Sequence, residues 1–159
     1  MQVEVLCVGK LKESYLREAC HEYLKRLSRF CKVNIVEFKD EAVSENASES
    51  LIFQAIEREG ERILSKVQDR DYVVSLCVEG KLLSSEELSK ELSRIEQIGA
   101  GRLVLIIGGS YGLSEKVKKR SNLRLSFSKM TFPHQLMRVI LLEQLYRAYK
   151  INANESYHK

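Results

Sequence analysis

The sequence contains no tryptophan, one proline and only eight glycines in 159 residues. A chain with so little proline and glycine leaves little room for linkers or disordered arms, and it shows no low-complexity tract or repeat. With 44% hydrophobic residues, a chain of this length can bury one substantial core. We therefore expect residues 1–159 to form a single domain.

Long apolar runs and metal-binding motifs are also missing. No segment approaches the roughly 20 apolar residues of a membrane-spanning helix, and the N-terminal MQVEVLCVGK has the pattern of a strand rather than a signal sequence. The four cysteines show neither CxxC spacing nor histidines at metal-ligand intervals. We expect a cytoplasmic protein with reduced thiols, no membrane contact and no metal.

Acidic residues are scarce in the C-terminal part of the chain. From Arg102 onward there are 11 Lys/Arg against 3 Asp/Glu, a balance of +8, whereas residues 1–101 hold 15 against 19, a balance of −4. A cationic surface suits a polyanionic partner, and nucleic acid is the commonest one. For the run KVKKR at 116–120 alone, a plain solvated helix face is the alternative.

Patterns typical of strands alternate with patterns typical of helices along the chain. The expected strands are 2–8, 32–38, 71–78, 102–107 and 123–127, and the expected helices are about 13–30, 47–68, 85–98, 115–121 and 133–150. Such alternation predicts an α/β fold with a mostly parallel sheet covered by helices on both faces.

Three strand ends carry unusual turns. LVLIIGGSYGLS at 103–114 ends an apolar strand in Gly-Gly-x-x-Gly, FSKMTFPH at 127–134 precedes a helix, and LCVEG at 76–80 ends another strand. The glycine turn is neither a Walker A loop nor a Rossmann fingerprint, so a plain tight turn is its alternative interpretation. Together the three turns predict a site, built mostly from main chain, for an adenosine-sized ligand.

Five segments in order carry a resemblance to a known family: LCVEGK, LIIGGSYGLS, SxSKMTFPHQLxR, LLEQLYRAYKI and the terminal NxxYHK. The sequence resembles the ribosomal RNA large subunit methyltransferase H family of the SPOUT class over its whole length. The resemblance implies an S-adenosylmethionine-dependent enzyme that methylates N3 of a pseudouridine in 23S ribosomal RNA of the assembled ribosome. It also implies a homodimer and a C-terminal trefoil knot around residues 103–150.

Site residues follow from the same resemblance. It implies cofactor contacts from Leu76, Gly108, Phe127, Ser128, Lys129, Met130, Thr131 and Phe132. Because N3 of a neutral pseudouridine carries a proton, transfer also needs a general base or cationic groups. We consider His158, Tyr157 and Arg138 the catalytic candidates, with Arg138 expected to contact a phosphate or the base. The alternatives are an exposed bystander histidine for His158 and a tail packed on the sheet surface for Tyr157.

The last helix presents more apolar side chains than one sheet face would cover, which favours a twofold dimer in which one tail reaches the other subunit's pocket. These are Leu136, Val139, Ile140, Leu141, Leu142, Leu145, Tyr146 and Tyr149. Two other functions remain open from the residues. A non-catalytic ribosome-associated RNA-binding protein would explain the basic half, and a Rossmann-like dehydrogenase would explain a glycine turn, although the N-terminal fingerprint is missing.

Overall fold

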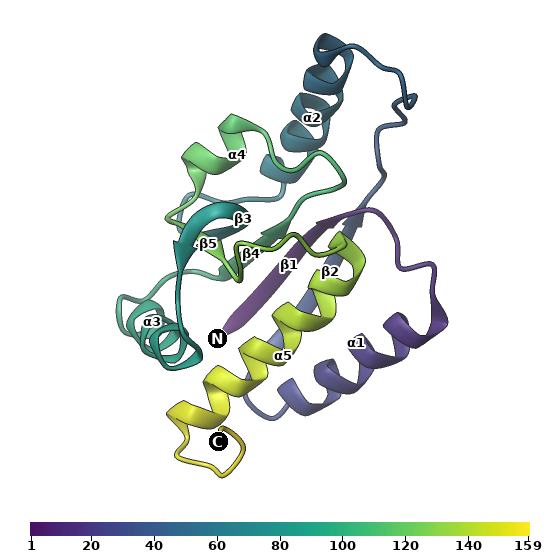
Figure 1. The fold of residues 1–159 in the computed structure, drawn as a ribbon. Coiled ribbons are helices and arrows are strands. Elements are labelled where there is room, and N and C mark those ends of the chain that lie inside the picture. The colour runs from purple at the N-terminus through teal and green to yellow at the C-terminus, as the bar shows by residue number, and fades with distance from the viewer.

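The five strands lie side by side in one parallel sheet in this computed structural model, which describes all 159 residues (Figure 1). The strands are β1 (Gln2–Val8), β2 (Lys32–Phe38), β3 (Tyr72–Leu82), β4 (Leu103–Ile107) and β5 (Leu123–Ser126), in the spatial order β2-β1-β4-β3-β5. Every neighbouring pair is parallel. The sequence prediction of a mostly parallel α/β sheet is confirmed.

Helices cover both faces of this sheet (Figure 1). They are α1 (Ser14–Leu27), α2 (Glu49–Leu64), α3 (Ser85–Gln97), α4 (Glu115–Arg120) and α5 (His134–Asn152). Helices α1, α3 and α5 pack on one face and form the larger core, and α2 and α4 form the smaller core on the other. None of the five has both the length and the apolar character that crossing a membrane demands.

Alternation along the strands assigns side chains to these two cores. In β1, Val3 and Val5 point into the larger core, whereas Leu6 and Val8 point into the smaller one. All five residues of β4 are buried, because this central strand is covered on both faces. Continuous apolar runs in the sequence therefore correspond to the middle of the sheet.

Parallel pairing brings the carboxyl ends of all the strands to the same edge. Helix α5 begins at this edge and runs across the sheet, so that the C-terminal tail lies at the opposite end of the molecule (Figure 1). Loops that follow β3, β4 and β5 therefore meet near the first turn of α5, which is the usual position of ligand sites in α/β proteins. The trefoil knot implied by the resemblance stays a prediction.

Candidate active site

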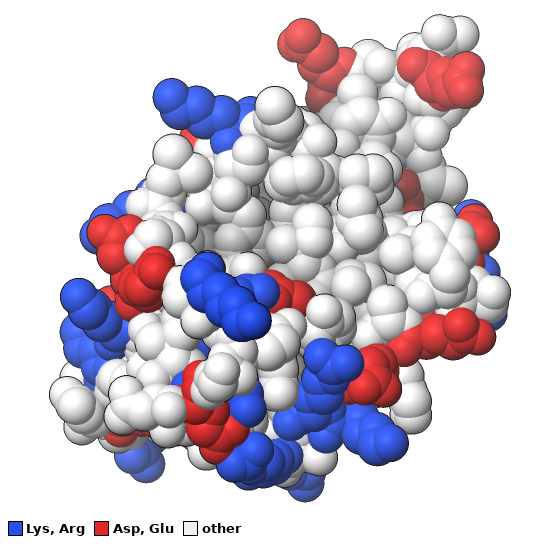
Figure 2. Space-filling view, turned by 60° about the horizontal axis from the view of Figure 1, so that its bottom comes forward, with Lys and Arg blue, Asp and Glu red and all other residues white.

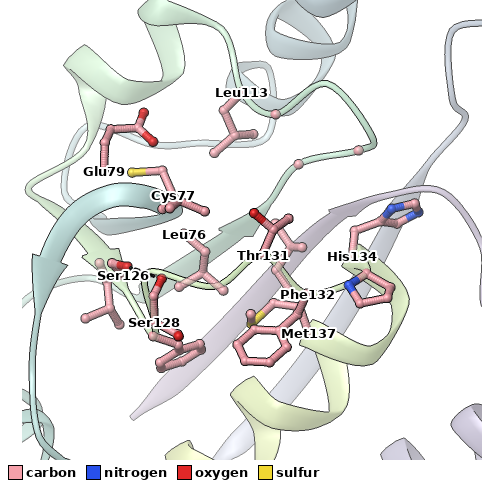
Figure 3. A pocket seen from close by; sticks show the side chains of 18 of the residues that line it. Leu76, Cys77, Glu79, Leu113, Ser126, Ser128, Thr131, Phe132, His134 and Met137 are labelled. Atoms are coloured by element: carbon pink, nitrogen blue, oxygen red, sulfur yellow. Dashed lines mark hydrogen bonds between the residues drawn. The ribbon is translucent and has the colours of Figure 1, made fainter.

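A pocket of about 640 Å³ lies where the loops after β3, β4 and β5 meet the start of α5 (Figure 3). It lies within the usual size range of small-molecule sites, about 300–1,000 Å³. Its lining comprises Leu76, Cys77, Val78, Glu79, Ile107, Gly108, Gly109, Ser110, Tyr111, Gly112, Leu113, Lys118, Leu125, Ser126, Phe127, Ser128, Met130, Thr131, Phe132, Pro133, His134 and Met137.

The glycine turn after β4 forms one wall. The amide of Gly112 donates a hydrogen bond to the carbonyl oxygen of Gly109 (3.1 Å), and Gly112 has a φ of 85°, which disfavours residues with a Cβ. At Gly108 a Cβ would lie 2.8 Å from the carbonyl oxygen of Gly112. The turn can close this tightly only because Gly108 has no side chain. Its main chain therefore faces the pocket.

A bulge in β3 forms the second wall. Leu76 and Lys81 both align with Leu125 of β5, so residues 77–80 leave the regular pairing. A Cβ on Gly80 would approach the backbone of Arg124 to 2.8 Å, so glycine allows the two strands to resume contact. The strand consequently continues to residue 82 instead of ending near 78 as the sequence predicted, and the bulge extends into the pocket wall.

Hydroxyl groups shape the third wall, which follows β5. Ser126 Oγ donates to the carbonyl oxygen of Ser128 (3.0 Å), and Ser128 Oγ accepts a hydrogen bond from the amide of Met130 (3.0 Å). These bonds fold the loop back on itself, and Thr131 and Phe132 follow it along the pocket (Figure 3).

Seven of the eight expected cofactor residues line this pocket. The exception is Lys129, which is exposed and absent from the lining. Contact between the other seven and a cofactor stays a prediction. Sequence reasoning considered Lys118 only as part of the basic run 116–120 and did not single out Met137, because helical residues distant along the chain give no local signal of sharing a pocket with β3.

Charge is scarce in the pocket. The only formally charged side chains of the lining are Glu79 and Lys118, whose carboxylate oxygen and Nζ lie 2.5 Å apart. A hydrogen bond from Lys118 holds the pKa of Glu79 below its ordinary value, and the same bond raises the pKa of Lys118. Burial raises the pKa of the Cys77 thiol, so Cys77 is no thiolate nucleophile at neutral pH. No group of three or more His, Cys, Asp or Glu side chains is placed to hold a metal ion.

Arg138 does not line the pocket. Its side chain is 2% exposed, Nη1 donates to Glu37 Oε2 (2.6 Å), and Nη2 donates to the carbonyl oxygen of Gly9 (3.2 Å). Its guanidinium is therefore buried and bonded within the chain, and a contact between Arg138 and a base or phosphate stays a prediction. Arg138 ties the start of α5 to β2 and to the loop after β1.

The tail residues Tyr157 and His158 lie well away from the pocket. Tyr157 donates to Glu143 Oε1 (3.2 Å), and His158 lies with Nδ1 3.2 Å from Arg147 and Nε2 2.7 Å from Glu86. Arg147 is thirteen residues beyond the pocket residue His134, which is roughly 20 Å along a helix. One chain alone therefore does not bring its tail to its own pocket.

A family model described as "Predicted SPOUT methyltransferase" matches residues 1–158. The chain belongs to the SPOUT methyltransferase family. It is 56% identical to "Ribosomal RNA large subunit methyltransferase H" of Clostridium novyi (strain NT) and 52% identical to the protein of the same name from Bacillus thuringiensis (strain Al Hakam), each over 100% of both chains. The fold is similar to that of a probable methylase family protein from Haemophilus influenzae Rd KW20, with a TM-score of 0.54, 11% identity, and coverage of 99% of this chain and 70% of that one.

Membership of the SPOUT methyltransferase family implies use of S-adenosylmethionine in general, and the pocket fits such a ligand. The glycine turn leaves a cradle that a single Cβ at Gly108 would obstruct, and three loops supply amide and carbonyl groups beside the apolar side chains of Leu76, Phe127 and Phe132. Main-chain polar groups next to apolar surface suit an adenosine moiety. Family membership also removes the Rossmann-like dehydrogenase from consideration.

Proposed function

We propose that this protein transfers a methyl group from S-adenosylmethionine to N3 of a pseudouridine in 23S ribosomal RNA. We further propose that it acts in the cytoplasm as a homodimer on the large subunit of the assembled ribosome. The observation that carries the proposal is the pocket at the carboxyl edge of the sheet, where a glycine turn and two further loops surround a cradle of main chain. Relatives that match the chain end to end are named ribosomal RNA large subunit methyltransferases, which supports the RNA substrate.

Binding is assigned to the residues of the three pocket walls. Leu76, Phe127 and Phe132 would enclose the adenine, and the backbone around Gly108 and Met130 would bond to its edge and to the ribose. Bound S-adenosylmethionine supplies a methyl group on a sulfonium that is already reactive. The chain therefore has to align the acceptor base with that methyl group and exclude water rather than activate the donor.

Removal of the N3 proton is assigned to the tail. His158 has an imidazole suited to accepting a proton near neutral pH, and Tyr157 has an aromatic ring that can stack on an unstacked base. Both lie outside the pocket of their own chain. We propose that His158 of the partner subunit and its neighbouring tyrosine complete the site, so that each active site contains the pocket of one chain and the tail of the other.

Helix α5 offers the apolar surface for that dimer. Leu141, Leu142 and Leu145 are buried in the core of one chain, but Leu136 is 38% exposed, and Val139 and Ile140 remain half-buried. Apolar surface left over on a helix that already packs on a sheet is typical of an interface between subunits.

The proposed function is tested by methyl transfer from labelled S-adenosylmethionine to ribosomes that lack the modification, with the product nucleoside identified by mass spectrometry. The expected product is N3-methylpseudouridine from 23S RNA. Ribosomes already modified serve as the control and should accept no methyl group. Absence of both transfer and cofactor binding would instead favour a non-catalytic RNA-binding protein, the alternative that the basic half of the chain supports.

A further inference from the structure

We propose that Glu79 and Lys118 form a subsite for the zwitterionic α-amino acid end of the ligand and exchange their mutual ion pair for bonds to it. Glu79 would accept from the ligand's α-ammonium group, and Lys118 would donate to its α-carboxylate. The inference rests on the proposed function, because that function supplies a ligand with an adenosine at one end and a free amino acid at the other. It assigns a role to the only two formally charged side chains of the pocket lining.

The charge distribution of the pocket is the first observation. Every other lining residue is apolar, hydroxyl-bearing or glycine, apart from Cys77 and His134. A zwitterion enters such a pocket only where both of its charges find partners, because an unpaired buried charge is strongly unfavourable. Glu79 and Lys118 provide one partner of each sign within 2.5 Å of each other.

The position of the pair is the second observation. Glu79 lies on the bulge of β3, and in the close view it is on the other side of the pocket from His134 (Figure 3). Lys118 lies on α4, whose first turn is fixed by Ser114, the N-cap residue that accepts from the amide of Val117. The pair thus joins two walls of the pocket away from the start of α5.

The two side chains differ in freedom. The Lys118 side chain is 17% exposed, whereas that of Glu79 is 57% exposed and can swing with little loss of packing. Glu115 also lies near Lys118, with 3.8 Å between its carboxylate and Nζ, so Lys118 keeps an acidic neighbour when Glu79 turns away. Exchange of partners leaves every charge compensated, which makes replacement of the internal pair by the ligand feasible.

The test compares two thioether ligands that differ only in the amino acid end. S-adenosylhomocysteine has it, and 5′-methylthioadenosine lacks it. Titration calorimetry of the full-length protein gives the ratio of the two dissociation constants. Two charge-assisted hydrogen bonds predict that S-adenosylhomocysteine binds roughly ten- to a hundredfold more tightly than 5′-methylthioadenosine.

Lys118→Met and Glu79→Gln should each reduce that ratio by about tenfold while leaving the affinity for 5′-methylthioadenosine unchanged. Unchanged binding of the short ligand also shows that the pocket has kept its shape. Lys116→Met is the matched control, since Lys116 lies on the same helix, is exposed, and is not part of the pocket. It should leave both affinities as they are.

Two results would overturn the inference while the proposed function stands: a ratio that neither substitution changes, or an equal loss of both ligands, which would make the pair only a structural brace. Failure of the unsubstituted protein to bind either ligand would contradict the proposed function itself. The two failures are therefore distinguishable in one set of titrations.

Discussion

The two ends of the molecule differ in the chemical groups that form them. At the carboxyl edge of the sheet the pocket consists of main chain, apolar rings and hydroxyls, with one ion pair. At the opposite end the tail is held by charged groups, among them Arg29, Lys150 and Glu155. Lys and Arg side chains correspondingly gather in the lower part of Figure 2, interspersed with Asp and Glu, and the middle of that face is largely uncharged.

This difference has a physical consequence. Tight backbone turns fix the pocket without the help of solvent-sensitive charges, so its shape is preset for a ligand. The tail depends on partly exposed ion pairs, which salt screens, and on the packing of Tyr157 against Tyr146. A preset pocket and a loosely held tail suit a site in which the tail has to meet another subunit and an RNA surface.

Removal of residues 157–159 takes away the end of the tail and should reduce activity more than any other change considered. We expect methyl transfer to fall by about two to four orders of magnitude, because the proposed proton acceptor is lost. Cofactor affinity should stay within about twofold, since no tail residue lines the pocket. Activity assays and calorimetry on the same preparation check both statements. Full activity after truncation would remove the tail from the mechanism.

Gly108→Val alters the glycine turn that forms one wall of the pocket. The new side chain would collide with the carbonyl of Gly112, 2.8 Å from the position of its Cβ, and the turn would have to open. We expect cofactor affinity to fall by about a hundredfold. As a control, Gly99→Ala places a Cβ at a positive φ (68°) on a residue outside the pocket lining. It should cost about 1 kcal/mol of stability and leave cofactor binding intact.

Arg138→Met removes a buried charge at the start of α5, at the pocket end of the molecule. Its loss leaves Glu37 unpaired, and since that carboxylate is 36% exposed we expect a cost of about 2 kcal/mol. Urea denaturation measures this value. Arg26→Met removes an exposed pair with Glu22 at 3.0 Å and should lower the free energy of unfolding much less than Arg138→Met does. Equal costs would contradict the assignment of Arg138 to the framework.

Acid should loosen the tail, which is the smallest of the expected effects. Hydrogen bonds from Lys150 and Arg29 hold the pKa of Glu155 below its ordinary value. The attraction is therefore complete above the ordinary pKa of glutamate and is lost as the pH falls through the lowered value. Protection factors of the tail amides, which are corrected for the intrinsic slowing of exchange in acid, should fall over that range. Glu155→Gln should reproduce the change at neutral pH, while Glu45→Gln, in an exposed loop, should not.

Much of the fold was predictable because its signals are local. Apolar runs at 103–107 and 2–8 identified the buried strands, and alternation of strands with helices predicted the parallel sheet. The length of β3 was not predictable, because its continuation depends on the backbone of Arg124, more than forty residues later. Long-range pairing of this kind leaves no mark in the local pattern.

The features of the site likewise divide into those with a local sequence signal and those that depend on long-range contacts. The glycine turn and the hydroxyl-rich turn predicted two of the pocket walls from the sequence. The bond between Arg138 and Glu37 was not predicted, because the two residues lie 101 positions apart in the sequence. The pairing of Glu79 with Lys118 was not predicted for the same reason. In the sequence Lys118 is only one charge on a short helix, and the fold brings it beside the bulge of β3.

Mixed dimers test whether each active site combines the pocket of one chain with the tail of the other. Chains carrying Gly108→Val keep the tail but lose the pocket, and chains lacking residues 157–159 keep the pocket but lose the tail. Each should be inactive alone. Equal co-expression should restore about a quarter of wild-type methyl transfer, because half of the dimers are mixed and each mixed dimer has one complete site. A mixture as inactive as its components would contradict the claim.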